Sequence, residues 1–286
     1  MVGHFEGAGL DLESVKVNIR DNDFHLKRYN NGATEKIVFL HGFTGSMHTW
    51  DEVIQHLPRS FDIITIDLIG HGETSKPIDP ACYVVEEQIA DLHALLQQLQ
   101  WSNFTLVGYS MGGRLALAYA TQYPVKKLIL ESSSPGIKNK EERVIRQQSD
   151  EQLANRILNG GIISFVDFWE GIPLFFSQRR LSNEKQQLIR LERLAGSEIG
   201  LANSLRGFST GIQPSYWNQL EEIIIPTFLI TGELDVKFSQ LAKEMKKSLI
   251  NGIHQEIKDA GHAIHVENPE LFATIVEDII LKEEER

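Results

Sequence analysis

The stretch Leu106–Arg114, LVGYSMGGR, decides the fold. It contains a Gly-x-Ser-x-Gly pattern centred on Ser110, which is typical of a serine on a sharp turn between a strand and a helix. Small residues on both sides let the backbone make that turn, and the hydroxyl then stands exposed at the end of the strand. Arg114 raises a second question, because it places a cation one helical turn after the serine.

Short apolar runs alternate with helical patterns on both sides of this stretch, which predicts a mainly parallel sheet covered by helices. The expected buried strands are KIVFLHG, DIITIDLIG, FTLVGYS, KLILESS and TFLITGE. Before them, SVKVNIR and FHLKRYN predict an antiparallel hairpin that turns around residues 21–23. The expected helices are EEQIADLHALLQQLQ, MGGRLALAYATQY, SQLAKEMKKSL and NPELFATIVEDIILKE, the last with Asn268 as its cap and Pro269 in its first turn.

One segment breaks the alternation. Residues 135–212 show helical periodicity and no convincing strand, so we expect a helical cap inserted between two strands of the sheet. The core would then comprise residues 1–134 and 213–286. The cap has a slight excess of basic residues, whereas the whole chain has a net charge of −11. This contrast indicates either an anionic ligand or ordinary variation in surface charge.

Composition narrows the classes of partner. The 286 residues contain a single cysteine, Cys82, which excludes an internal disulfide and a cysteine-based metal cluster and favours a reducing compartment. The first residues lack a signal-peptide pattern, and no apolar run approaches the length of a membrane span. The net charge of −11 argues against nucleic acid or an anionic membrane as partner. We therefore expect a cytoplasmic monomer or small homo-oligomer that acts on a small molecule.

A catalytic triad is expected around Ser110. A serine hydroxyl needs an imidazole to take its proton and a carboxylate to orient that imidazole. In sheets of this type the three occur in the order serine, acid, histidine, each after a strand. Asp235 follows the strand TFLITGE, and His262 lies in DAGHAIHVENP before the last helix.

Other residues compete for two of these positions. Asp259 and Glu233 are alternatives for the acid, and His265 is an alternative for the base. The loop position directly after the strand favours Asp235, and the turn glycine before His262 favours that histidine.

Backbone N–H groups complete the expected site. The strand that runs into His41-Gly42-Phe43 brings the N–H of Phe43 near the serine, and the N–H of Met111 follows the serine directly. These two are the natural pair for an oxyanion hole. We expect the side chain of His41 to pack behind the turn. The glycine-rich DLIGHGETSKP (67–77) lacks the spacing of a phosphate-binding loop and is interpreted as a structural turn.

Taken together, HGF, DLIGHGETSKP, GYSMGG, TGELD and AGHAIHVENP resemble the α/β-hydrolase superfamily, from about residue 20 to the end. The resemblance implies a mainly parallel central sheet flanked by helices. These motifs are shared by esterases, haloperoxidases, carbon–carbon hydrolases and lyases, so they do not select a reaction.

Other stretches are more selective. GYSMGGR, SSPGIKNKEERVIRQQSDEQLA, FVDFWEGIPLF, LANSLRGFSTGIQPSYWNQL and TGELDVKF are similar to the 2-succinyl-6-hydroxy-2,4-cyclohexadiene-1-carboxylate (SHCHC) synthases of menaquinone biosynthesis, the MenH family. This resemblance implies a lyase that needs no metal or organic cofactor. It would eliminate pyruvate from 2-succinyl-5-enolpyruvyl-6-hydroxy-3-cyclohexene-1-carboxylate, with Ser110 as a general base.

The implied substrate carries three carboxylates, and a guanidinium offers two parallel donors to a carboxylate. The residues that the resemblance assigns to substrate binding are Arg114, Arg146, Lys237, Arg193, Tyr109 and Trp169. Arg146 and Arg193 would reach down from the cap. Arg143 lies three residues before Arg146 on the same side of a helix and is an alternative to it.

Two further classes stay open on the sequence. A serine hydrolase of an ester or carbon–carbon bond in an acidic substrate would use the same triad, with Ser110 as a true nucleophile or as an activator of water. A binding protein without activity could share the fold, but it would have no need of Asp235 and His262 behind the serine.

Overall fold

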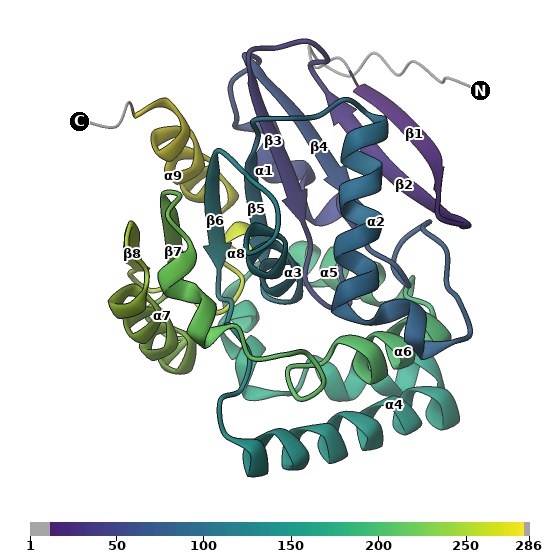
Figure 1. The fold of residues 1–286 in the computed structure, drawn as a ribbon. Helices are drawn as coiled ribbons and strands as arrows, with labels where there is room; N and C mark the ends of the chain where they lie inside the picture. Colours follow the sequence, from purple (N-terminus) through teal and green to yellow (C-terminus); the bar gives the residue numbers. More distant parts are fainter. Residues whose placement is uncertain (1–11, 283–286) are drawn as a thin grey trace.

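A computed structural model describes residues 12–282. Its centre is an eight-stranded sheet in the order β1-β2-β4-β3-β5-β6-β7-β8 (Figure 1). The strands are β1 (Leu12–Ile19), β2 (Asn22–Tyr29), β3 (Glu35–Leu40), β4 (Phe61–Ile66), β5 (Thr105–Tyr109), β6 (Lys127–Glu131), β7 (Thr227–Gly232) and β8 (Gly252–Ile257). β1 and β2 pair antiparallel, β2 meets β4 antiparallel, and the other pairs are parallel. The predicted mainly parallel sheet is confirmed.

The strands differ from the sequence predictions at two places. The turn of the first hairpin is centred on Arg20 and Asp21, both with positive φ, slightly earlier than expected. Two such residues give a turn whose twist matches that of the flanking strands. The edge strand β8 was not predicted, because only one of its residues is buried and its sequence GIHQEI has little apolar character. By contrast, β4, β5 and β6 are buried at every residue, as expected for strands covered on both faces.

The helices follow the strands in the expected alternation. The α-helices are α1 (Asp51–Gln55), α2 (Val85–Gln98), α3 (Met111–Ala120), α4 (Lys140–Trp169), α5 (Asn183–Leu194), α6 (Glu198–Phe208), α7 (Val236–Ser248), α8 (Ile264–Glu267) and α9 (Pro269–Leu281). Four short 3₁₀-helices are η1 (Met47–Trp50), η2 (Pro80–Tyr83), η3 (Pro173–Arg180) and η4 (Trp217–Glu222). Asn268 caps α9 through its side chain, as predicted, by accepting from the N–H of Leu271.

Apolar side chains cover both faces of the sheet. One cluster joins the sheet to α2, α3 and α7, and the other joins it to α1, α8 and α9. The carboxyl ends of the parallel strands stay free of these layers, and the loops that follow the strands meet there.

The segment between β6 and β7 lies across those carboxyl ends (Figure 1). It consists of α4, η3, α5, α6 and η4, and α4 bends at Gly161, whose φ is +78°. A third apolar cluster, which includes Phe165 and Leu201, joins α4 to α6, and Phe43 of the core packs against it. We call residues 135–212 the cap, and its boundaries stay a prediction.

Two sequence expectations concern chain ends. The absence of a signal peptide rests mainly on residues 1–11. The charged stretch LKEEER (281–286), which the sequence predicts to be a solvated helix end, includes residues 283–286. Residues 1–11 and 283–286 lie outside the described residues.

Candidate active site

Ser110 stands on a strained turn between β5 and α3. Its φ of 49° and ψ of −106° are unusual for a residue with a side chain. The turn is possible only because its neighbours are small. A Cβ on Gly112 would lie 2.3 Å from the carbonyl oxygen of Leu40, and one on Gly108 would lie 2.5 Å from the carbonyl oxygen of Gly112. The Gly-x-Ser-x-Gly pattern is therefore a steric requirement of this turn.

A chain of two hydrogen bonds joins Ser110 to His262 and Asp235. The hydroxyl of Ser110 lies 3.1 Å from Nε2 of His262, and Nδ1 of His262 lies 2.6 Å from Oδ2 of Asp235. His262 and Asp235 are buried. The short contact to the carboxylate indicates that Nδ1 carries the proton, so Nε2 is free to accept from the serine.

Asp235 is held by the start of α7. Its side chain caps that helix by accepting from the N–H of Phe238 at 3.3 Å. The backbone N–H of Asp235 donates to the carbonyl of Gly232, at the end of β7. The carboxylate thus has a fixed position after the strand, as the sequence predicted.

The competing residues have other partners. Glu233 accepts from the N–H of Asp259 at 3.0 Å, so these two competing residues are paired with each other. His265 pairs with Glu131 at 2.7 Å, and both side chains are fully buried. Among the described residues, only His262 of these candidates contacts Ser110.

The N–H groups of Phe43 and Met111 have no hydrogen-bond partner within residues 12–282. Met111 is the first residue of α3, where N–H groups lack a partner inside the helix. The positive end of the α3 dipole points the same way. This is the arrangement that an oxyanion hole requires.

The loop that carries Phe43 is braced from behind. The buried ring of His41 accepts from the N–H of Leu68 at 3.0 Å, and its Nδ1 lies 2.7 Å from the carbonyl of Gly42. Burial lowers the pKa of His41 to about 4, so the ring is neutral near pH 7. The structure therefore gives His41 the packing position expected from the sequence.

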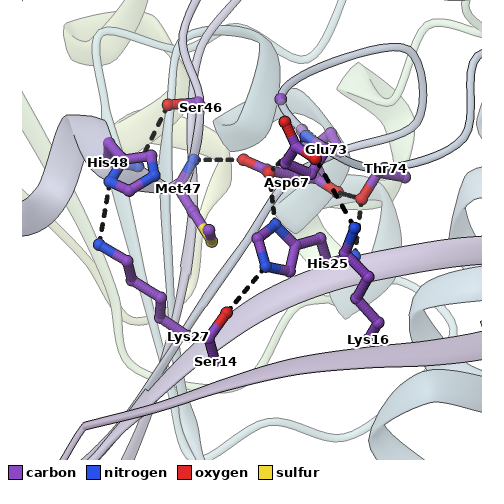
Figure 2. A network of polar contacts seen from close by, with 12 residues as sticks. Ser14, Lys16, His25, Lys27, Ser46, Met47, His48, Asp67, Glu73 and Thr74 are labelled. Carbon is purple, nitrogen blue, oxygen red and sulfur yellow. Dashed lines mark hydrogen bonds and ion pairs between the residues drawn. The ribbon is translucent and has the colours of Figure 1, made fainter. Parts of the chain in front are cut away.

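Figure 2 shows a second brace, centred on Asp67. Its carboxylate accepts from the N–H of Met47 at 2.7 Å and from the N–H of Glu73 at 2.8 Å. His25 Nδ1 lies 3.5 Å from this carboxylate, and His25 Nε2 lies 2.9 Å from Ser14 Oγ. Asp67 thus ties the 43–47 loop to the turn after β4, which supports the interpretation of 67–77 as structural.

A cavity of about 690 Å³ opens beside the serine, between the core and the cap. Five of the six expected substrate-binding residues line it: Tyr109, Arg114, Arg146, Trp169 and Lys237. The cavity is also lined by residues that the sequence did not predict, among them Lys138, Glu142, Leu174, Phe175, Phe208, Trp217, Phe238 and Glu244. No local pattern marks these residues, because they meet only through the packing of the cap on the core.

Arg114 lies half-buried in the cavity wall. Its guanidinium donates to the carbonyl of Phe208 at 2.8 Å and to the side-chain oxygen of Gln213, and it lies 4.4 Å from the centre of the Phe208 ring. Burial and the neighbouring charge of Arg146 lower the pKa of Arg114 to about 9, so it stays charged at pH 7. Within residues 12–282, no carboxylate forms an ion pair with it.

The two cap arginines of α4 have different surroundings. Arg146 lines the cavity and donates from Nε to both carboxylate oxygens of Asp150, at 2.9 and 2.7 Å. Arg143 instead donates to backbone carbonyls of the 211–213 segment. The geometry therefore places Arg146 at the cavity and gives Arg143 a role in holding the cap.

Arg193 does not line this cavity. It is 7 % exposed, lies 4.6 Å from the centre of the Phe175 ring, and donates to Gln178 at 3.0 Å. Its closest acidic partner is Glu170 at 3.6 Å. Phe175 separates Arg193 from the cavity, because its side chain lines the cavity and its ring also packs against the guanidinium of Arg193. The spacing of charges along a helix could not reveal this shielding.

Trp169 has an indole N–H that is buried without a hydrogen-bond partner in the described part of the chain. Its ring packs edge-on against Phe43, with centroids 5.5 Å apart. Tyr109 lies directly before the serine, and burial is the main cause that raises its pKa well above 10. Lys237 is exposed at the rim, two residues after Asp235.

Comparison with known proteins agrees with this geometry. The family model for the alpha/beta hydrolase fold matches residues 36–269. A Bacillus subtilis relative, named provisionally as an SHCHC synthase, is 46% identical over 87% of this chain and 91% of its own. The SHCHC synthase of Salmonella typhimurium is 33% identical over 83% of this chain and 90% of its own.

A solved structure extends the comparison to three dimensions. MenH from Staphylococcus aureus superimposes with a TM-score of 0.84 and 38% identity, covering 88% of this chain and 96% of the other. The chain therefore belongs to the alpha/beta-hydrolase-fold family and, within it, to the SHCHC synthases, a family of lyases built on this fold.

Proposed function

We propose that this protein is an SHCHC synthase of menaquinone biosynthesis. It eliminates pyruvate from 2-succinyl-5-enolpyruvyl-6-hydroxy-3-cyclohexene-1-carboxylate and leaves 2-succinyl-6-hydroxy-2,4-cyclohexadiene-1-carboxylate. Membership of the family supports this reaction. The observation that carries it for this chain is a cation beside the serine that forms no ion pair with a carboxylate of residues 12–282.

That cation is Arg114. A charge removed from water is costly unless a counter-charge meets it. Its present contacts are the neutral oxygens of Phe208 and Gln213 and the Phe208 ring. A substrate carboxylate would supply the missing counter-charge through two parallel hydrogen bonds. A site for a neutral ester has no use for such a group.

The rest of the cavity suits several carboxylates. The basic residues on its wall are Arg114, Lys138, Arg146 and Lys237, whereas Glu142 and Glu244 are the acidic ones. We assign Arg146 and Lys237 to further carboxylates of the substrate, and Tyr109 and Trp169 to its ring and polar groups. Arg193 reaches the substrate only if Phe175 moves aside.

The triad acts as a proton relay in this proposal. Asp235 keeps the proton on Nδ1 of His262, so Nε2 accepts the hydroxyl proton of Ser110. At the same time the oxygen of Ser110 takes the proton from the ring carbon that bears the succinyl group. No bond forms between the serine and a substrate carbon.

The electrons of the broken C–H bond then move through the substrate. Negative charge develops on the succinyl carbonyl oxygen, where the N–H groups of Phe43 and Met111 stabilise it. Conjugation carries the electron pair into a second ring double bond as the C–O bond to the enolpyruvyl group breaks. Pyruvate leaves as its enolate and takes up one proton, equivalent to the one that His262 received, so the triad returns to its starting state. The resulting enol then tautomerises. The closed cap excludes water during these steps.

A serine hydrolase acting on an acidic substrate is the second candidate. It is favoured by the 3.1 Å contact between Ser110 and His262 and by the free N–H groups of Phe43 and Met111, which would serve a nucleophilic serine equally well. In that case an acyl group would be attached to Ser110 during turnover.

The test supplies the enolpyruvyl substrate to the purified protein. We expect pyruvate and the absorbing cyclohexadiene in equal amounts, with an unmodified Ser110 in intact-protein mass spectra taken during turnover. An acylated Ser110, or a product that has gained water, would instead support the hydrolase.

A further inference from the structure

A second serine, histidine and aspartate lie in a row outside the cavity (Figure 2). The hydroxyl oxygen of Ser14 lies 2.9 Å from Nε2 of His25, and Nδ1 of His25 lies 3.5 Å from Oδ2 of Asp67. Ser14 belongs to β1, His25 to β2, and Asp67 directly follows β4. Because these three strands are neighbours in the sheet, the row crosses them from the edge strand inward.

The register of the hairpin brings the serine and the histidine to one face of the sheet. His25 lies directly opposite Lys16, and Lys16 is two residues after Ser14. Side chains two residues apart on a strand point to the same face. The contact between Ser14 and His25 therefore follows from regular strand pairing and needs no special loop.

The histidine and the aspartate are held by the backbone around them. The N–H of His25 donates to the hydroxyl of Thr74 at 2.9 Å, and its carbonyl accepts from the N–H of Asp67 at 3.0 Å. The carboxylate of Asp67 also accepts from the N–H groups of Met47 and Glu73. His25 is 9 % exposed and Asp67 is 1 % exposed. The base and the acid are thus preorganised, as they are behind Ser110.

The surroundings of His25 favour a neutral ring with its proton on Nδ1. The charged groups that face the ring are Lys16 of β1 and, in the turn after β4, Asp67 and Glu73. Burial is the main cause that lowers the pKa of His25 below 6.5. Within residues 12–282, Nδ1 has no hydrogen-bond partner, and the Asp67 carboxylate faces it. A proton on Nδ1 is attracted by that carboxylate, which leaves Nε2 to accept from Ser14.

We propose that Ser14 is a second activated serine, which takes an acyl group from small esters with a good leaving group. Ser14 is exposed on the edge strand, so a small ester reaches its hydroxyl directly. The serine oxygen forms a bond with the acyl carbon while His25 takes the hydroxyl proton. The bond between the acyl carbon and the leaving oxygen then breaks, and His25 gives up its proton to the solvent or to the leaving group. An acyl ester remains on Ser14.

The test uses the Ser110→Ala protein, so that the outcome does not depend on the reaction proposed for Ser110. The protein is treated with p-nitrophenyl acetate at pH 7.5, and peptide mass spectrometry follows the acetyl group on individual serines. Ser102, which is also exposed, is the internal control. We expect Ser14 to be acetylated about 100-fold faster than Ser102, because a positioned general base accelerates such steps by about 100-fold or more. Equal rates at the two serines would overturn the proposal.

His25→Asn in the same background removes the base and should lower the acetylation rate of Ser14 to that of Ser102. An unchanged rate would contradict the role of His25. If this variant fails to fold, the pH profile of the Ser110→Ala protein decides. With a neutral His25 as base, the rate at Ser14 should be nearly constant from pH 7.5 to pH 9. A serine without a base reacts through its alkoxide, so a rise of about tenfold per pH unit would overturn the proposal.

Discussion

At the residue scale, the pairing of an activated serine with an unneutralised arginine distinguishes this site. Ser110 is held in a strained backbone conformation with His262 in reach, a geometry that an esterase shares. Arg114 adds the selectivity, because its charge lies on the cavity wall and its hydrogen bonds within the described part of the chain go to neutral oxygens. The serine therefore indicates how a proton or an acyl group is moved, and the arginine indicates what kind of molecule is bound.

Replacing Arg114 should weaken the enzyme toward its anionic substrate. We expect Arg114→Ala to lower kcat/KM by about 30-fold or more, because truncating one partner of a buried charge pair costs about 2 kcal/mol or more. Arg180→Ala removes an exposed cap arginine as the matched control. Steady-state pyruvate release at pH 7 gives both values, and equal kcat/KM in the two variants would contradict the assignment.

Arg114 also predicts a pH dependence. Its pKa of about 9 in the free protein means that its charge is lost as the pH rises through that value. Bound substrate anions favour the charged form, so kcat/KM should fall above about pH 9 while kcat is less affected. A kcat/KM that stays constant from pH 8 to pH 10 would contradict this role for the charge.

At the element scale, the cap and core meet through small residues. Gly200 of α6 packs on Gly70 in the turn after β4, and a Cβ on Gly200 would lie 1.9 Å from the carbonyl oxygen of Gly70. Polar links add to this contact, because Glu192 of α5 accepts from Ser46 and Thr49 in the loop after β3. The cap is therefore seated on the loops that carry the site.

Gly200→Ala should separate α6 from the core. We expect a loss of about 1–3 kcal/mol in the free energy of unfolding, which is typical of overpacking. Gly160→Ala is the matched control in α4, because its Cβ would meet nothing nearer than 3.4 Å and alanine favours a helix. Urea unfolding monitored by tryptophan fluorescence measures both. A Gly200→Ala variant as stable as the wild type would show that the cap tolerates a wider separation.

The elements were predictable where the sequence carries a local signal. The buried strands and the serine turn follow from apolar runs and from glycines, and the triad acid and base follow from their place after a strand and before the last helix. The edge strand β8 lacked such a signal because only one of its six residues is buried. Local patterns do not encode how the cap packs on the core. They therefore could not predict that Phe175 shields Arg193, or that Ser177 of the cap donates to Glu267 of α8.

At the scale of the whole molecule, buried neutral histidines tie stability to pH. Burial lowers the pKa of His41 to about 4 and that of His71 to about 3. In the unfolded chain histidine binds a proton near pH 6.5, so between about pH 6.5 and pH 4 the unfolded state carries more protons than the folded state. The free energy of unfolding should therefore fall as the pH drops through this window.

Each such histidine contributes a slope of up to about 1.4 kcal/mol per pH unit. His71→Asn should flatten the pH dependence of the free energy of unfolding between pH 6 and pH 4, whatever its effect at pH 7. His56→Asn, at an exposed position, should leave the slope unchanged. Urea titrations at several pH values give the slopes, and identical slopes for wild type and His71→Asn would contradict the account.

No helix among residues 12–282 is both long and apolar enough to cross a membrane. The cytoplasmic location and the oligomeric state stay predictions from the sequence.

The most direct test of the central claim is the rate of pyruvate release from the enolpyruvyl substrate by three proteins. These are the wild type, Ser110→Ala, and Ser102→Ala as an exposed serine control. We predict that Ser110→Ala is slower than the wild type by about 1,000-fold or more, because the general base and its relay are lost, while Ser102→Ala equals the wild type. Pyruvate release by Ser110→Ala at the wild-type rate, or none by the wild type, would contradict the account.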